Sequence, residues 1–389
     1  MKIETNFTKD LQKQMQEWRH AIHQKPELDF NLDNTSSMVA SLLKEFGLEV
    51  HERIGKSGIV AILKKGKGTD SIGLRADMDA LKIQEENTFA HCSKEKGKMH
   101  ACGHDGHTAM LLGAAKYLAL HGTFNGSVYF IFQPAEEHGL GAKAMINDGL
   151  FDKFNINSIY AIHNFPSLQT GHFAIKEGAV MAAEDNFEIT INAIGHHAAM
   201  PHLGKDAIVI ASQIVGAIQN IVSRNIDPMQ NAVISFTEFI TNGTVNVVPG
   251  QVILKGDTRS LSLEVQKQIE ESMHRVVKGI CLSHEVSYEF SYIKNFCPTI
   301  NTRIEANIAA KIAGEIVGEH KVITNSKEVM TSEDFGWMLK EKKGAYILLG
   351  NGKGETEGIS LHNPKYDFND KILNDGADFW VHLVQSCLK

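Results

Sequence analysis

The sequence predicts an α/β protein: a mostly parallel sheet with helices on both faces, plus an inserted ferredoxin-like α+β module. Three observations lead to this prediction. Short apolar runs alternate with helical patterns near both ends of the chain, which is typical of a parallel sheet covered by helices. Between these regions the pattern changes to strands in which apolar and polar residues alternate. The length of 389 residues leaves room for two or three domains.

The larger part is predicted from short apolar runs bounded by Gly, Pro, Asp or Asn. These runs lie at 58–63, 72–74, 128–132 and 159–162. Helical patterns lie near 107–120 and 140–148, and Asn34 can cap an earlier helix that ends at Gly47. After Pro298 the alternation resumes with a helix at 303–317, a strand at 346–350 and a helix from about 370. We therefore expect one domain built from 1–183 and 296–389.

The module between these two parts has its own order of elements. Phe187, Ile189 and Ile191 alternate with polar residues, as in a strand with one wet face. The elements that follow are a helix near 205–223, strands near 231–240 and 247–258, a helix near 262–280 and a strand near 285–292. This β-α-β-β-α-β order is that of a ferredoxin-like fold. We expect it to form an inserted domain over 184–295.

Composition excludes several classes of protein. The charge of 39 − 46 = −7, without a long basic run, argues against a nucleic-acid partner. No apolar leader and no run of eighteen apolar residues is found, so we expect no membrane partner and a cytoplasmic location. The five cysteines are scattered and contain no C-x-x-C pair, which argues against a disulfide framework.

Most of the clustered His, Asp, Glu and Cys residues fall in five segments. They are GLRADMDAL (73–81), MHACGHDGHTA (99–109), FQPAEEHGLGA (132–142), YAIHNFP (160–166) and SLHNPKYDF (360–368). In four of them the polar residues follow an apolar run, which places them at the carboxyl ends of strands, where open α/β sheets bind ligands. One crevice can therefore collect all five segments.

Five side chains in these segments offer metal-ligand chemistry: Cys102, His104, Glu137, His163 and His362. Thiolate, imidazole and carboxylate groups suit zinc-like or manganese-like ions. Five such groups fit two ions that share a bridging ligand better than one ion. The sequence therefore predicts a hydrolytic centre with two divalent ions, among Mn, Zn, Ni and Co.

The adjacent carboxylates Glu136 and Glu137 would repel each other unless cations neutralise them. In an extended loop they point in different directions, so one can bind a metal while the other acts as a general base. Asp77 and Asp79 follow a predicted strand in the same way, and either can orient an imidazole ligand. We take Asp77 as the candidate for that supporting role.

These segments contain two other patterns that have known functions in other proteins. His100 and His104 are spaced as in a zincin helix, but Ala101 replaces the required glutamate, and Gly103 and Gly106 are expected to break the helix. The stretch 139–144 matches the G-x-G-x-x-A loop of dinucleotide-binding proteins. Two carboxylates directly before it would repel a pyrophosphate, which disfavours a nicotinamide-dependent oxidoreductase.

These motifs resemble the aminoacylase and hippurate hydrolase branch of the dimetal amidohydrolases, relatives of plant hydrolases that release indole-acetic acid from amino-acid conjugates. The resemblance runs from about His20 to the C-terminus and includes GHHAAMPH (195–202), NVVPG (246–250) and MTSEDF (330–335). It implies the same five metal ligands, with Glu136 as the general base. It also implies that the inserted domain is a lid and a dimerisation module.

The resemblance singles out three residues of that lid. His197 matches a histidine that stabilises the oxyanion across a dimer, and Asn246 and Arg259 match positions that contact substrate. His196 is an unusual neighbour, which leaves open which of the two histidines faces the site. A guanidinium at Arg259 would suit the free carboxylate of an N-acyl amino acid.

The expected activity is hydrolysis of the amide bond of N-acyl or N-aroyl amino acids, by a homodimer or higher homo-oligomer acting on a small molecule. Glu136 takes the proton of the attacking water and returns it to the leaving amine. N-acetyl-diaminopimelate deacetylation is the nearest enzymatic alternative. A metal-stabilised binding protein without catalysis is the alternative from another class, but it would have no use for the second carboxylate, Glu136.

Overall fold

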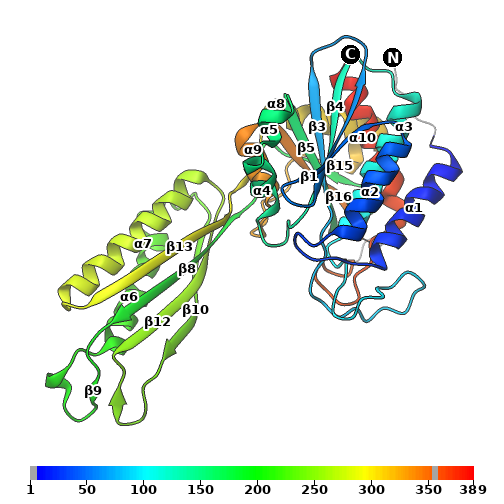
Figure 1. The fold of residues 1–389 in the computed structure, drawn as a ribbon. Coiled ribbons are helices and arrows are strands. Elements are labelled where there is room, and N and C mark those ends of the chain that lie inside the picture. The colour runs from blue at the N-terminus through cyan, green and yellow to red at the C-terminus, as the bar shows by residue number, and fades with distance from the viewer. Residues whose placement is uncertain (1–6, 353–357) are drawn as a thin grey trace. The chain divides into compact units, whose positions relative to one another are not determined.

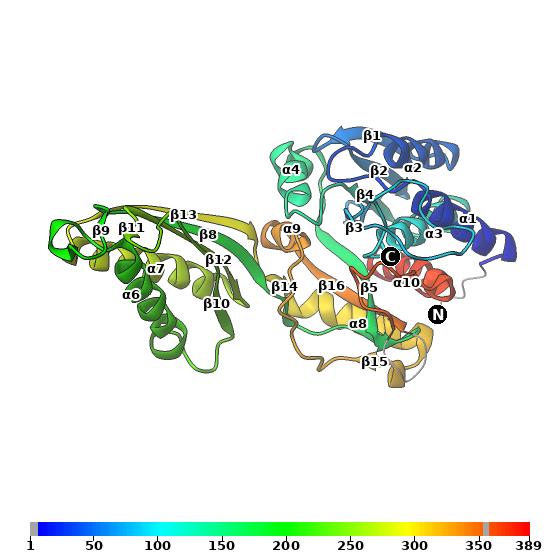
Figure 2. The same ribbon diagram turned by 90° about the horizontal axis from the view of Figure 1, so that it is seen from below.

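The computed structural model describes residues 7–352 and 358–389, which form two compact units. The first unit contains the described residues up to Val180, Ile300–Lys327 and the described residues from Asp334 to the end. The second unit contains Met181–Thr299 and the short segment Glu328–Glu333. The predicted fold class, a mostly parallel sheet with helices on both faces together with a ferredoxin-like module, is confirmed (Figures 1 and 2).

The first unit is built on an eight-stranded sheet in the order β1-β2-β4-β3-β5-β16-β6-β15. The strands are β1 (Glu49–Ile54), β2 (Gly58–Lys65), β3 (Ser71–Asp77), β4 (Gly126–Gln133), β5 (Ser158–Gln169), β6 (Phe173–Ala174), β15 (Val322–Ile323) and β16 (Lys343–Gly352). The central strands β4, β3, β5 and β16 are parallel, and β1 and β2 add an antiparallel hairpin at one edge. The carboxyl ends of the central strands therefore meet at one edge of the sheet.

Helices cover both faces of this sheet. One face shares a single hydrophobic core with α1 (Lys9–His23), α2 (Asp33–Glu45), α3 (His104–His121), α8 (Arg303–Val317) and α10 (Leu373–Cys387). The strands contribute alternate residues to that core, such as Ile72 and Leu74 of β3, so the residues between them face the other side. There α4 (Gly141–Asn147) and α9 (Phe335–Glu341) pack on β4, β5 and β16, and α5 (Leu150–Lys153) packs on α4.

The start of α2 differs from the prediction. Asn34 was expected to cap the helix, but α2 begins at Asp33, and its N-cap residue Leu32 makes no side-chain cap bond. The cap comes from Glu27, whose carboxylate accepts hydrogen bonds from the backbone N–H groups of Asn34 (3.0 Å) and Thr35 (2.8 Å). The prediction was wrong because the carboxylate of Glu27, seven residues before Asn34, accepts the free backbone N–H groups at the start of the helix.

The second unit has the β-α-β-β-α-β order. Its elements are β8 (Ala183–Asn192), α6 (Ala207–Asn220), β10 (Ala232–Thr241), β12 (Gln251–Ser260), α7 (Leu263–Ser283) and β13 (Ser287–Phe296). The strands form an antiparallel sheet in the order β10-β12-β8-β13, and α6 and α7 share a hydrophobic core with it (Figure 2). The short strands β9 (His196–His197) and β11 (Val247–Val248) pair with each other, and so do β7 (Gly178–Met181) and β14 (Thr299–Asn301).

The helix over Ala207–Asn225 is long and apolar enough to cross a membrane by length and composition alone. Its residues Ile210, Ile214 and Ile218 repeat every four positions and are buried in the core of the second unit. Ile208 and Val209 of the same helix are exposed.

Candidate metal centre

Three parallel strands deliver polar side chains to one edge of the first unit's sheet. Asp77 ends β3, Glu136 and Glu137 follow the end of β4 by three and four residues, and His163 lies within β5. β3 is paired with both β4 and β5, so these side chains come from neighbouring strands. This is the arrangement that open α/β sheets use to gather ligand groups.

The fourth ligand segment enters α3. Gly103 adopts φ +91°, a left-handed conformation that favours glycine, and His104 is the first residue of the helix. His100 and His104 therefore do not share a helix, and the zincin arrangement is absent. Gly106, however, lies inside α3, so the expectation that it breaks the helix was wrong. A Cβ there would lie 2.3 Å from the ring of Phe368, which accounts for the glycine by close packing.

The five predicted ligands form one chain of neighbours. The Nε2 atom of His163 lies 3.5 Å from the Cys102 sulfur. Ligand atoms of Cys102, His104 and Glu137 all lie within 4.8 Å of one another. The other oxygen of Glu137 lies 3.5 Å from Nε2 of His362. The structure thus brings all five side chains together in the first unit.

Two buried atoms of this cluster lack hydrogen-bond partners among the described residues: Nε2 of His104 and Oε1 of Glu137. They lie 3.8 Å apart. Buried polar groups are nearly always paired, because an unpaired one costs about 1 to 3 kcal/mol. A lone pair and a carboxylate oxygen facing the same space fit a divalent cation, so the residues present suit the predicted metals.

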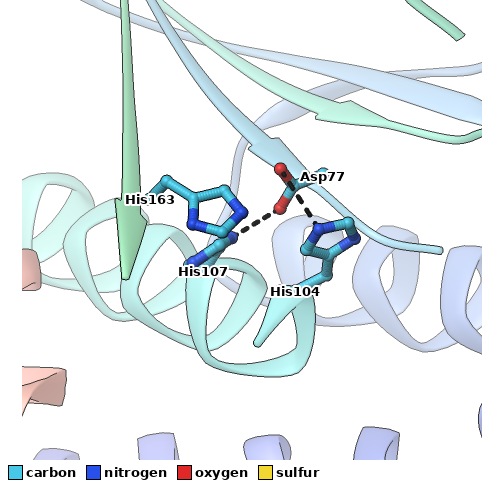
Figure 3. Close-up of side chains that lie close together, drawn as sticks. All are labelled: Asp77, His104, His107 and His163. Carbon is cyan, nitrogen blue, oxygen red and sulfur yellow. Dashed lines mark hydrogen bonds and ion pairs between the residues drawn. The ribbon is translucent and has the colours of Figure 1, made fainter. Parts of the chain in front are cut away.

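Asp77, His104, His107 and His163 also lie close together (Figure 3). His107 is held on both ring nitrogens: Nδ1 bonds Asp77 at 2.6 Å, and Nε2 accepts the backbone N–H of Asn164 at 2.9 Å. The other Asp77 oxygen accepts a hydrogen bond from Arg75 at 2.7 Å. This group is therefore a hydrogen-bond network beside the ligands, with His104 and His163 at its edge.

The orientation of His104 comes from Asp79. The ring Nδ1 bonds the backbone carbonyl of Asp79 at 2.8 Å, whereas Asp77 lies 3.8 Å from Nε2. Asp77 makes its imidazole contact with His107, which is not one of the predicted ligands. The sequence offers both aspartates for this role: Asp77 forms an ion pair with His104, and the Asp79 carbonyl makes the hydrogen bond to it.

Asp79 also holds the loop of the two glutamates. Its carboxylate accepts the backbone N–H groups of Glu136 at 3.0 Å and Glu137 at 3.2 Å. Glu137 then points one oxygen at His104 and the other at His362. Glu136 is almost fully buried, with Oε2 3.9 Å from His104 Nε2. The two carboxylates are thus directed differently, as the ligand and base roles require.

Without cations, the acidic surroundings favour protons on the ligands. Burial opposes a charged imidazole, but Asp77, Asp79 and Glu137 raise the pKa of His104 to about 10. Burial raises the pKa of Glu137 to about 7. Burial and the nearby carboxylates raise the pKa of the Cys102 thiol well above its usual range. Cations would replace these protons, since bound ligands must be deprotonated.

The residues predicted for the lid lie in the second unit. His197 and Asn246 are neighbours, because β9 pairs with β11 and the backbone N–H of Ala198 donates to the Asn246 carbonyl at 3.0 Å. The side chain of His197 is exposed, whereas His196 is half-buried and packs against Gly204. His197 is therefore the histidine that this unit presents outward.

Arg259 is already paired within the second unit. Its guanidinium contacts the carboxylates of Glu184 at 2.7 Å and Asp257 at 2.6 Å. A substrate carboxylate at this residue would have to compete with both groups.

Residues 73–386 match the model of peptidase family M20/M25/M40. The chain belongs to this family. Over 98% of both chains it is 43% identical to a hippurate hydrolase of Campylobacter jejuni. It is 42% identical to an N-acyl-L-amino acid amidohydrolase of Geobacillus stearothermophilus, over 69% of this chain and 73% of that protein.

A solved structure supports the same family membership. A dinuclear metal-binding peptidase of family M20 from Bacillus subtilis superposes with a TM-score of 0.84 at 29% identity, covering 98% of this chain and 99% of that one. The predicted class, an amidohydrolase of the dimetal family, is confirmed, and the dinucleotide-binding alternative is excluded. Gly141 of that stretch has a packing reason: a Cβ there would lie 1.6 Å from the Pro134 carbonyl oxygen.

Proposed function

We propose that this enzyme hydrolyses the amide bond of N-acyl and N-aroyl amino acids with two divalent ions held by Cys102, His104, Glu137, His163 and His362. The observation that supports it most is the cluster of these five side chains, of which Cys102, His104 and His163 are buried and His362 is exposed, with a further buried carboxylate, Glu136, beside it. The activities of the two relatives, a hippurate hydrolase and an N-acyl-L-amino acid amidohydrolase, support the substrate class. A purely structural metal site would not need Glu136.

The residues of the chain divide the chemistry between them. Bound divalent ions would lower the pKa of a water molecule and polarise the substrate carbonyl. Glu136 takes the proton of the attacking water and transfers it to the leaving amine nitrogen. The carboxylate of Asp79 keeps Glu136 in place by accepting a hydrogen bond from the backbone N–H of Glu136. His197 donates a hydrogen bond to the oxyanion of the tetrahedral intermediate.

Substrate recognition is assigned to the second unit, which acts as the lid. Asn246 lies beside His197 on the β9–β11 hairpin and contacts the substrate. Arg259 pairs with the free carboxylate of the substrate, by exchanging one of its two carboxylate partners, Glu184 or Asp257.

The active form is a homodimer joined through the second unit. β10 is an edge strand of the sheet, and its residues Phe239 and Ile240 are exposed, as are Ile208 and Val209 of α6. An apolar edge strand of this kind is suited to pairing with a second copy.

All five cysteines are free thiols, which supports a reducing, cytoplasmic location.

The test is release of free amine from a substrate panel. Hippurate, N-acetyl amino acids and N-acetyl-diaminopimelate are supplied to protein that has been stripped with a chelator and reconstituted with Mn, Zn, Co or Ni. Hydrolysis of hippurate or simple acyl amino acids only after metal is added is the expected result. Preference for N-acetyl-diaminopimelate would reassign the substrate, and no turnover by the metal-loaded protein would favour the binding protein.

A further inference from the structure

We propose that Asn164 is a positioning residue that sets the geometry of the metal centre by joining the ligand-bearing segments to one another. It is fully buried and directly follows the predicted ligand His163 on β5. The inference rests on the proposed function, because it takes the five predicted ligands as given.

The backbone of Asn164 fixes two imidazole rings. Its carbonyl oxygen accepts a hydrogen bond from Nδ1 of His163 at 2.7 Å, which leaves the lone pair on Nε2, the atom that faces the Cys102 sulfur. Its N–H donates to Nε2 of His107 at 2.9 Å, so that His107 presents its proton on Nδ1 to Asp77. One residue therefore sets the tautomer of both rings.

The side chain of Asn164 ties down two further segments. Its Nδ2 group donates to the Cys102 carbonyl at 2.6 Å and to Nε2 of His107 at 3.0 Å. Its Oδ1 atom accepts the hydroxyl of Tyr366, four residues after His362. The side chain thus connects the loop of Cys102 with the segment of His362, and every polar group of Asn164 is used.

Gly103 provides independent support. A Cβ built on Gly103 would lie 2.3 Å from Asn164 Nδ2 and 2.8 Å from the Tyr366 hydroxyl. The loop between two metal ligands therefore passes so close to this amide that only glycine fits. Its φ of +91° is a second reason for glycine there.

An amide suits this position because it donates and accepts at once. Aspartate has nearly the same shape but cannot donate to the Cys102 carbonyl, and its charge alone would favour cations. If only the charge at position 164 affected metal affinity, the Asn164→Asp variant would bind metal more tightly. If Asn164 acts by position, Asn164→Asp and Asn164→Ala both bind metal more weakly. The two explanations therefore predict opposite changes for Asn164→Asp.

The experiment measures the affinity of the metal-free protein for Zn²⁺ by chelator competition, with the thiolate-to-cobalt absorption band of the Co²⁺-loaded protein as a second readout. Asn301→Ala is the matched control. Asn301 is a buried amide of the same unit that makes three hydrogen bonds to backbone groups of Lys176 and Tyr346. It contacts none of the ligand segments through those bonds.

We expect Asn164→Ala and Asn164→Asp to lose about 10- to 100-fold in Zn²⁺ affinity, the usual effect of removing a group that orients a metal ligand, and to alter the cobalt band. Tyr366→Phe should give a smaller loss in the same direction, and Asn301→Ala should give none. If Asn164→Ala does not fold, Asn164→Asp and Tyr366→Phe decide by the same measurements. Parental affinity and band in these variants would overturn the inference, whereas a parent protein that binds no metal would overturn the proposed function with it.

Discussion

Replacing Asp79 by Asn tests the support of the two glutamates. The carboxylate of Asp79 uses both oxygens, one for the N–H of Glu136 and one for the N–H of Glu137. Asparagine offers only one accepting oxygen and turns an NH₂ group toward the other N–H. The change removes one charge-assisted hydrogen bond and leaves a buried donor unpaired, which costs about 1 to 3 kcal/mol.

The catalytic effect should exceed the loss of stability. A shift of about 1 Å in a reacting group can lower the rate roughly 100-fold, and Glu136 is held in place by the bond that Asn weakens. We therefore expect Asp79→Asn to lower kcat about 100-fold and to lower the free energy of unfolding by about 2 kcal/mol, measured by urea denaturation.

Asp206 provides the matched control. Its carboxylate also accepts two backbone N–H groups, those of Ile208 (2.9 Å) and Val209 (3.1 Å), but through a single oxygen at the start of α6. Asparagine caps a helix as well as aspartate does, so Asp206→Asn should change neither stability nor kcat. Parental kcat in Asp79→Asn would refute the assignment of Asp79, and an equal loss in Asp206→Asn would show a general effect of removing a carboxylate.

Three further results are expected. Arg259→Ala should lower kcat/KM for N-acyl amino acids by a factor that corresponds to about 2 kcal/mol of transition-state stabilisation, and should affect the amidated substrates much less. Equal losses would show that Arg259 only pairs within the second unit. Metal affinity, titrated from pH 6 to 9, should rise with pH, because protons must leave His104, with a pKa of about 10, and Glu137, with a pKa of about 7; a flat profile would contradict this. Burial opposes charge on His23, but Asp105 raises its pKa from 6.5 to about 9. Charged His23 therefore stabilises the folded protein fully below pH 6.5, and this stabilisation is lost as the pH rises through 9. His23→Gln should therefore lower the free energy of unfolding by about 3 kcal/mol more at pH 6 than at pH 10, and equal losses would argue against a charged His23.

The sequence predicted the sheet and the ligand cluster because their patterns are local. Each apolar run of strand length became a strand, and the polar residues after those runs gathered at one edge, as parallel strands require. The helix at 303–317 matches α8 residue for residue. Patterns of this kind depend only on neighbouring residues.

The supporting residues could not be predicted, because their partners are distant in the chain. The Arg19 side chain is fully buried and pairs with Asp105 and Asp367, yet in sequence it belongs to a helix rich in charged residues. Asn164 follows a ligand in an apolar strand and has no motif of its own. Asp77 and Asp79 are equivalent in sequence, and only the fold shows which one holds the glutamate loop.

Glu136 and Glu137 have different roles in the proposed mechanism, the first as general base and the second as metal ligand. Glu136→Gln and Glu137→Gln are prepared in parallel, and metal content by elemental analysis is compared with kcat on hippurate. We expect Glu136→Gln to keep its metal and to lose about 10² to 10⁴ in kcat, and Glu137→Gln to lose metal. Full activity in Glu136→Gln, or turnover by protein shown to contain no metal, would contradict this mechanism.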